Sequence, residues 1–512
     1  MNRREFLAAP ALLGAQTKPV RPGIALNEDN SHYFFTRAGQ TLNAAAVDSF
    51  IDQYAGTQVR ELMLCPNSMR TSYSSKVWDP VWRGYDPLGP DNQPLLASLA
   101  PEASKSIRRW IHTAWELDRK GIDPYQRWIA RCRKHGISPW LSMRMNDIHE
   151  VNNERSPMHS EFWRRNPQFR RVPYRDGFRE RAFDYGHAEV RKYHMALVLE
   201  LIERYDFDGL ELDWMRFGFH FRPGQEARGA DLLTDFTRQV RTLLRQKEKR
   251  RGHRIKLGAR VPSRPHTAAG LGMDGARWAR EGLVDMLVVT PFFSSAEFDM
   301  PIELWKQLLR GTGVTLAAGL EILVRPNPEM TPPPHMSLET ARGAAASLLD
   351  RGADRIYLFN YMDSETAIED LDNYRTLLSE LGDPAALAGK PRRHVLTFAD
   401  TWAPGEPAAP PPLPLKCGPG KWSAFRLATG PKPASSPVSV RLGIDPSGSG
   451  WEVRLNGELC SAAGTVTPGH SSPGKPLSAF RVPEAAVVRG YNLVEVRAAS
   501  EATIFWVEVM VG

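Results

Sequence analysis

Short apolar runs alternate with longer amphipathic stretches between residues 22 and about 382. The short runs end in polar residues, as buried strands do, and the longer stretches carry apolar residues at roughly i, i+3, i+4 and i+7, the spacing of one helix face. Alternating strands and helices indicate a parallel sheet. The expected strands are Gly23–Asn27, Val59–Pro66, Ile137–Asn146, Gly209–Arg216, Ile255–Pro262, Val284–Pro291, Val314–Glu321 and Arg355–Tyr361. The expected helices are Ala44–Tyr54, two pieces within Ser104–His135, Ala188–Tyr205, Asp231–Arg250, Asp274–Arg280, Glu303–Leu309, Leu338–Asp350 and Ala367–Leu381.

Eight strands, each followed by a helix, predict a closed (β/α)8 TIM barrel. An open, doubly wound parallel sheet is the alternative architecture. No glycine-rich dinucleotide-binding or phosphate-binding motif begins any of the expected helices, which argues against a nucleotide cofactor. We expect no cofactor of any kind.

The pattern changes after residue 393. A proline-rich stretch at 403–412 cannot form the interior of a helix or sheet and is typical of a linker or a rigid loop. Beyond it, short alternating segments such as WEVRLNGEL at 451–459 predict strands, and the Asn-Gly pair predicts a tight turn between two of them. The sequence therefore predicts an α/β barrel over 21–392, a linker over 393–415 and a jelly-roll-like all-β sandwich over 416–512. The sandwich either binds carbohydrate or only caps the barrel.

Composition narrows the class of protein. The chain has 512 residues, 42% hydrophobic and 24% charged, which is typical of a globular protein, and no apolar run reaches the roughly 20 residues needed to cross a bilayer. The net charge of +8 comes without a basic, aromatic-interleaved motif, so we expect no nucleic-acid partner, while a preference for acidic sugars stays open. The four cysteines lack zinc-ligand spacing, and Cys417 could pair with Cys460 in an oxidising compartment.

Residues 1–20 have the pattern of an export signal. Arg3-Arg4-Glu5-Phe6-Leu7 is followed by a short apolar run and small residues, as in a twin-arginine signal. The alternative is an ordinary amphipathic helix. We expect a bacterial protein that is periplasmic or secreted.

Candidate catalytic acids stand at the ends of two expected strands. Glu211 and Asp213 share one face of the fourth strand, opposite Leu210 and Leu212, because strand side chains alternate. Burying an unpaired charge is costly, so these acids are not there for packing alone. Glu321 ends the seventh strand, nearly across the barrel, and an acid from each side suits glycoside hydrolysis by two carboxylates.

A purely structural role is the alternative for each acid. Glu211 and Asp213 could form a polar layer with Arg144 or Arg260, and Glu321 could form a salt bridge with Arg325 or Arg260.

Other strand ends supply side chains that suit a hydroxyl-rich ligand. Arg144 and Asn146 are the strongest of these, since alternation puts both on one face of the third strand. The candidate substrate-binding residues are Glu211, Arg144, Asn146, Asp147, His149, Arg216, Arg260, Asn67, Asn360 and Tyr361. The aromatic residues expected to stack on sugar faces are Trp214, Phe292, Phe293 and Tyr185.

The run FDYGHAEVRKYHMALVLELIERYDFDGLELDWMRF at 183–217 resembles a segment of bacterial glycoside-hydrolase-like TIM-barrel proteins, in which a Tyr-x-His helix leads into a D-G-[IL]-x-[LF]-D strand. MRMNDIH at 143–149 is similar to another strand end in such proteins. The resemblance spans roughly residues 22–382 and implies a sugar-processing barrel with Asp213 as nucleophile. This chain lacks an acid at the ends of its fifth and sixth strands, where some of these families place the acid/base, which leaves Glu321 as the partner.

Three functions follow from these residues. The first is an exported glycoside hydrolase with Asp213 and Glu321 as its carboxylate pair. The second is a barrel enzyme in which Glu211, Asp213 and Glu321 hold a divalent cation. The third is a sugar-binding barrel without catalysis. Carbohydrate is the expected partner in the first and third; the oligomeric state is left open.

Overall fold

The computed structural model describes residues 21–175, 177–292, 295–364, 366, 368–446, 450–467, 469–471 and 473–512. Its first part is a closed barrel of eight parallel strands in sequence order, with β1 also paired to β8. The strands are β1 Ile24–Glu28, β2 Val59–Leu64, β3 Ser138–Arg144, β4 Gly209–Asp213, β5 Lys256–Pro262, β6 Met286–Thr290, β7 Thr315–Leu320 and β8 Arg355–Leu358. All eight expected strands and the closed barrel are confirmed.

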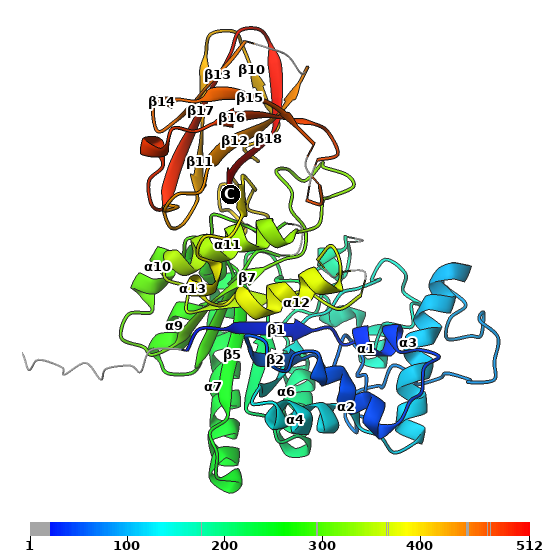
Figure 1. Ribbon diagram of the computed structural model, residues 1–512. Coiled ribbons are helices and arrows are strands. Elements are labelled where there is room, and N and C mark those ends of the chain that lie inside the picture. The colour runs from blue at the N-terminus through cyan, green and yellow to red at the C-terminus, as the bar shows by residue number, and fades with distance from the viewer. Residues whose placement is uncertain are drawn as a thin grey trace, which may run out of the picture.

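Helices surround the barrel, and the sandwich stands beside α11 (Figure 1). The helices are α1 His32–Thr36, α2 Ala44–Asp52, α3 Pro101–Arg119, α4 Pro124–Lys134, α5 Glu161–Arg165, α6 Ala188–Arg204, α7 Glu226–Arg251, α8 Pro265–Gly270, α9 Gly275–Arg280, α10 Ile302–Leu308, α11 Leu338–Asp350, α12 Leu371–Glu380 and α13 Pro384–Leu387. Several begin where a side chain caps them, as Asn43 accepts from Ala46 and Asp370 accepts from Asn373. Within the described ranges, no helix is long and apolar enough to span a membrane.

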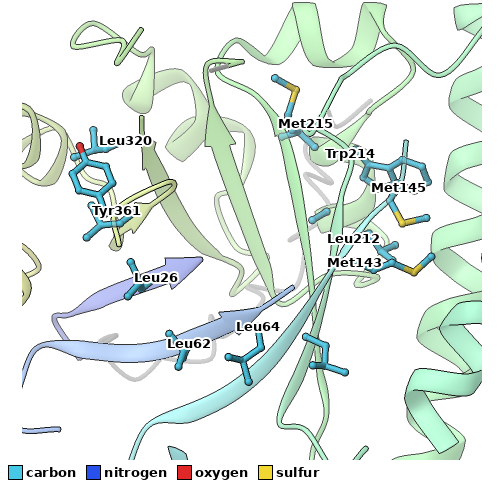
Figure 2. Packing of buried hydrophobic residues seen from close by; sticks show 14 of the residues in the cluster. Leu26, Leu62, Leu64, Met143, Met145, Leu212, Trp214, Met215, Leu320 and Tyr361 are labelled. Atoms are coloured by element: carbon cyan, nitrogen blue, oxygen red, sulfur yellow. The ribbon is translucent and has the colours of Figure 1, made fainter. Parts of the chain in front are cut away.

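The barrel wall separates two apolar layers. Outward-facing side chains of alternate strand positions pack under the helices, and Figure 2 shows part of this layer, with Leu62 on β2, Met143 on β3 and Leu212 on β4. The inner layer is built around Trp140. A Cβ at Gly209 would lie 2.2 Å from the Trp140 ring, so only glycine at that position leaves room for the indole.

The C-terminal part is a sandwich of two antiparallel sheets, as expected. One sheet has the order β10-β18-β12-β16-β15 with β9 also paired to β18, and the other has the order β11-β17-β13-β14. The predicted Asn-Gly turn joins β13 to β14, with positive φ at both Asn456 and Gly457. The strands are β9 Arg392–Val395, β10 Leu415–Cys417, β11 Trp422–Ala428, β12 Val438–Asp445, β13 Trp451–Leu455, β14 Glu458–Leu459, β15 Ser461–Val466, β16 Leu477–Arg481, β17 Tyr491–Ala498 and β18 Ala502–Val511. Cys417 and Cys460, which could have paired, are both free thiols here.

The division between barrel and sandwich differs from the one that the sequence predicts. β9 belongs to the sandwich although it lies at the expected end of the barrel, because Arg393 on β9 forms a buried ion pair with Glu508 on β18, with Nη2 and Oε2 2.7 Å apart. Residues 396–412, which we call the strap, then run back to the barrel loops after β5 and β6: the Phe298 amide donates to the Thr397 hydroxyl, and Arg264 donates to the carbonyl of Thr401. The sandwich therefore begins before residue 416, and the proline-rich stretch is held by contacts with the barrel.

Candidate active site

Asp213 and Glu321 meet at one arginine. Arg260 Nη1 lies 3.0 and 3.2 Å from the two carboxylate oxygens of Asp213, and its Nη2 lies 3.1 Å from Oε1 of Glu321. Asp213 ends β4, Arg260 lies in β5 and Glu321 follows β7, so the cluster forms at the carboxyl end of the barrel, where TIM-barrel enzymes carry their sites. The salt bridge that the sequence offered as a structural role for these acids is therefore formed.

Asp213 sits where the hydrogen bonds around it favour a carboxylate. Its Oδ1 accepts from the backbone amides of Met215 at 3.0 Å and Arg216 at 2.8 Å, in the turn that follows the strand. With the two contacts to Arg260, four donor contacts converge on this group, all of which stabilise its charged form. The residue is 1% exposed.

Glu321 is held differently. It is fully buried, and burial raises its pKa from 4.5 to about 8, against the opposing effect of Arg260 and Arg216. Asn360 Nδ2 lies 3.5 Å from its Oε2, and within the described part of the chain no backbone amide donates to its carboxyl group. Four donor contacts therefore reach the Asp213 carboxyl group and two reach that of Glu321, and the burial that raises the pKa of Glu321 favours a proton on Glu321. A pair of acids whose surroundings separate their proton affinities is suited to acid and base roles.

Glu211 lies deeper, inside the barrel. Its Oε1 accepts from the hydroxyls of Ser142 at 2.6 Å and Tyr357 at 2.8 Å, and Tyr357 in turn accepts from Asn27. Burial and the charge of Asp213 raise the pKa of Glu211 to about 7. Glu211 therefore belongs to a polar layer of the barrel interior below the mouth, and the expectation that it touches substrate is not supported by its place.

A cleft of about 460 Å³ opens over the ends of β1, β3 and β4, and the described residues that line it include Arg216 but neither Asp213 nor Glu321. Arg144 spans it, with Nη1 3.1 Å from Asp147 and Nη2 bonded to Asp29. Asp147 also accepts from His149, whose other ring nitrogen lies 2.9 Å from Arg216. Four of these residues were expected from the sequence, and Asp29 was not, although it directly follows β1 as the other candidates follow their strands.

Arg216 connects the cleft to the buried pair. It lines the cleft, and its guanidinium carbon lies 5.3 Å from the ring centre of Phe359. The guanidinium carbon of Arg260 lies 3.8 Å from the same ring. Contacts therefore run from the cleft through Arg216 and Phe359 to the arginine that holds Asp213 and Glu321.

Three of the polar residues expected to bind substrate instead form hydrogen bonds with the backbone. The amide of Asn146 bonds the backbone of Phe183 and Phe219, because β3 ends at Arg144 and the strand alternation that paired it with Asn146 does not continue. Asn67 donates to the carbonyl of Arg144, and the buried Tyr361 donates to the carbonyl of Glu321.

Two of the aromatic residues that were expected to stack on sugar faces are buried in the structure. Trp214 and Tyr185 are fully buried against each other under the helices, so they cannot stack on a sugar. Phe292 is half-buried and contacts Phe217, while Phe293 lies outside the described residues.

Two further acids, the buried Glu297 and the half-buried Asp400, were not expected. Glu297, after β6, accepts from the Ser263 hydroxyl at 2.5 Å, and burial raises its pKa to about 7. Asp400, in the strap, accepts from the backbone amide of Phe292 at 2.9 Å. Neither follows a predicted strand directly, so a search of strand ends does not reach them.

The acids do not form a metal-binding group. In the part of the chain that the structure describes, no three His, Cys, Asp or Glu side chains are arranged to hold a metal ion. Arg260 lies between Asp213 and Glu321 and supplies positive charge where the cation of the second hypothesis would lie.

Comparisons with known proteins concern the fold. No protein-family model matches the chain, and no curated protein matches it. Similar solved structures include the glycoside hydrolase domain of PgaB (BpsB) from Bordetella bronchiseptica, at 11% identity over 70% of this chain and 99% of that one, with a TM-score of 0.39. An α-L-fucosidase from Paenibacillus thiaminolyticus is 12% identical over 94% and 96% of the two chains, with a TM-score of 0.34. A Paenibacillus cycloisomaltooligosaccharide glucanotransferase is 8% identical over 95% of this chain, which spans 57% of that protein, with a TM-score of 0.33.

Proposed function

We propose that this protein is a glycoside hydrolase in which Asp213 and Glu321 are the catalytic carboxylates. The observation that carries the proposal is their shared contact with Arg260 at the carboxyl end of the barrel. Burial raises the pKa of Glu321 to about 8, which favours its protonated form. Hydrolysis of a glycosidic bond needs this combination of one protonated and one ionised carboxyl group.

Each acid has one role in the proposed reaction. Glu321 donates its proton to the leaving glycosidic oxygen as the bond to the anomeric carbon breaks. The Asp213 carboxylate stabilises the positive charge that develops on the sugar, and it either bonds to the anomeric carbon or accepts a proton from the attacking water. Arg260 fixes the two carboxyl groups relative to each other.

Substrate reaches this pair through the cleft. Since Asp213 is 1% exposed and Glu321 is fully buried, the Arg216 side chain, which contacts both the cleft and Phe359, must move when a sugar binds. Asp29, Arg144 and His149 then supply hydrogen-bonding groups for sugar hydroxyls along the cleft.

A sugar-binding barrel without catalysis is the second candidate, and the burial of the pair favours it. In that case Arg260 and its two acids only stabilise the barrel, and carbohydrate contacts the cleft alone. Wild-type protein that binds carbohydrate but does not hydrolyse it would support this second function.

We also propose that the protein is exported to the periplasm or secreted. This rests on the Arg3-Arg4-Glu5-Phe6-Leu7 pattern, which lies outside the described residues. Replacing Arg3-Arg4 by Lys-Lys should retain the protein in the cytoplasm, and unchanged periplasmic recovery would contradict a twin-arginine signal.

The hydrolase proposal is tested by screening the full chain against a library of oligo- and polysaccharides, beside Asp213→Asn. Asp208→Asn is the matched control, since Asp208 precedes the same strand at the opposite end of the barrel and pairs with Arg133 on the surface. We expect release of reducing sugar by the wild type and the control but not by Asp213→Asn. Equal activity in all three proteins would refute the role of Asp213.

A further inference from the structure

A histidine of the cleft accepts a hydrogen bond from Arg216. Nη2 of Arg216 lies 2.9 Å from Nε2 of His149, and Nδ1 of the same ring lies 2.9 Å from Oδ1 of Asp147. A guanidinium nitrogen only donates, so Nε2 carries a lone pair and no proton. Burial raises the pKa of Asp147, but His149 and Arg144 outweigh it and hold that pKa well below its usual range. The carboxylate therefore only accepts, the ring proton is on Nδ1, and the imidazole that holds Arg216 is neutral.

Arg216 lies between the cleft and the two acids. The described residues that line the cleft include Arg216 but neither Asp213 nor Glu321. The guanidinium carbons of Arg216 and Arg260 lie 5.3 and 3.8 Å from the ring centre of Phe359, and Arg260 contacts both acids. The backbone amide of Arg216 donates to Asp213 at 2.8 Å, so this side chain begins beside the acid pair and ends in the cleft. A ligand in the cleft therefore reaches the acids only after the guanidinium moves.

We propose that His149 is a positioning residue of the site: its neutral ring holds Arg216 between the cleft and the acid pair, and protonation of the ring releases it. A protonated imidazole has no lone pair to offer and carries a charge of the same sign as the guanidinium. The hydrogen bond is then lost and repulsion takes its place. His149 acts through Arg216 and does not contact the reacting bond. The proposal rests on the proposed function in taking Asp213 and Glu321 as the groups that a ligand has to reach.

The groups around His149 carry charges of both signs. Asp147 lies 2.9 and 3.0 Å from Nδ1 of the ring and also accepts from Arg144 at 3.1 Å. The Phe217 ring lies edge-on to the imidazole, with ring centres 5.0 Å apart, and Nε2 of His159 lies 3.1 Å from the backbone carbonyl of His149. The other charged or titratable residues that line the cleft are Asp29 after β1, His32 in α1, Arg109 in α3 and Glu150 next to His149. Because Asp147 is already shared with Arg144, protonation of His149 adds a second cation beside Arg216.

Two substitutions separate the hydrogen bond of His149 from its bulk. His149→Gln supplies a carbonyl oxygen that can accept from Arg216 at every pH, whereas His149→Phe keeps a planar ring and removes the acceptor. His253→Phe is the matched control, because the side chain of His253 is 34% exposed, against 36% for His149. His253 pairs with Asp206, which precedes β4 at the opposite end of the barrel.

Access to the acids is measured by chemical labelling, which needs no substrate. The full chain and each variant are treated with a water-soluble carbodiimide and glycine ethyl ester, and labelling of Glu321 is followed by peptide mass spectrometry. The reaction is run at about pH 5 and about pH 7.5, a range over which histidine usually changes its charge. Both values lie below the pKa of Glu321, which burial raises to about 8, so its carboxyl group stays mostly protonated. The proteins are compared with one another at the same pH, which cancels the effect of pH on the reagent.

We expect slow labelling of Glu321 at about pH 7.5 in the wild type, His149→Gln and His253→Phe, and labelling about tenfold faster in His149→Phe. At about pH 5 the wild type and His253→Phe should approach the rate of His149→Phe, while His149→Gln stays slow. Equal rates in all four proteins at both pH values would overturn the proposal. A wild type that is as slow as His149→Gln at about pH 5 would also overturn it, and this comparison stands even if His149→Phe does not fold.

The same experiment separates this inference from the proposed function. Hydrolysis by a protein whose labelling is equal in all four forms would overturn this inference alone. The expected labelling in a protein that hydrolyses no glycoside would overturn the proposed function and leave the link between His149 and Arg216 intact.

Discussion

Arg260 gives Asp213 two contacts, at 3.0 and 3.2 Å, in a place where both side chains are 1% exposed. Removing one partner of a buried ion pair typically costs about 3 to 5 kcal/mol, because the other charge is left without compensation. We therefore expect Arg260→Met to lower the free energy of unfolding by that amount in urea titration.

Two variants serve as controls for that measurement. Arg133→Met, which breaks surface ion pairs with Asp206 and Asp208, should cost less than about 1 kcal/mol. Adding Asp213→Asn to Arg260→Met should restore part of the loss, since the stranded charge is then gone. Equal, small effects of Arg260→Met and Arg133→Met would show that the buried pair is not charged.

The contacts of Glu211 differ from those expected from the sequence, in which it could form a polar layer with Arg144 or Arg260. In the structure its Oε1 accepts from Ser142 and Tyr357, and a glutamine oxygen can accept both bonds. We expect Glu211→Gln to change the free energy of unfolding at pH 7 by less than about 1 kcal/mol. Glu211→Ala, which strands both hydroxyls, should cost about 1 to 3 kcal/mol or more. A large loss in Glu211→Gln would contradict this account.

The raised pKa of Glu321 makes stability depend on pH. The folded protein binds this proton more tightly than the unfolded chain, whose pKa is 4.5, so the stabilisation is complete below about pH 4.5 and is lost as the pH rises through about 8. We expect the free energy of unfolding to fall less between pH 5 and pH 8 in Glu321→Gln than in the wild type. The difference between the two proteins cancels the contribution of other groups. Parallel pH curves would contradict a proton on Glu321.

A close backbone contact joins the barrel to the sandwich at Gly343, within α11. Alanine is favoured over glycine inside a helix by about 1 kcal/mol. A Cβ at this position would, however, lie 2.0 Å from the carbonyl oxygen of Arg393 on β9. Because overpacking typically costs about 1 to 3 kcal/mol, we expect Gly343→Ala to lower the melting temperature. A higher melting temperature would show that β9 does not lie against the helix.

Alternation along a strand predicted the site only as far as each strand extends. It placed Glu211 and Asp213 on the inner face of β4 with Leu210 and Leu212 outside, as observed. It failed for Asn146, because β3 ends two residues earlier. Alternation within β4 could not predict the hydrogen bond between Glu211 and Tyr357 on β8. That contact depends on how far the strands of the closed barrel are staggered.

The strap shows a second limit of sequence patterns. Proline content correctly excluded regular structure in its second half, but nothing local indicates that Asp400 returns to β6. β9, which precedes the strap, pairs with β18 at the far end of the sequence, and the buried ion pair of Arg393 and Glu508 lies between these two strands. The candidate residues expected from the sequence reach no further along the chain than Tyr361, so none of them lies in the strap.

The roles of Asp213 and Glu321 are tested most directly by the leaving group. Aryl glycosides of the sugar identified in the library screen are compared, one with a strongly acidic phenol as leaving group and one with a weakly acidic phenol, on the wild type, Asp213→Asn and Glu321→Gln. A general acid matters little when the leaving group departs without a proton. We expect Asp213→Asn to lose about a thousandfold or more in kcat/KM on both substrates, and Glu321→Gln to lose as much on the weakly acidic phenol but far less on the strongly acidic one. Equal losses in Glu321→Gln on both substrates, or activity retained in Asp213→Asn, would contradict the assignment of acid and carboxylate.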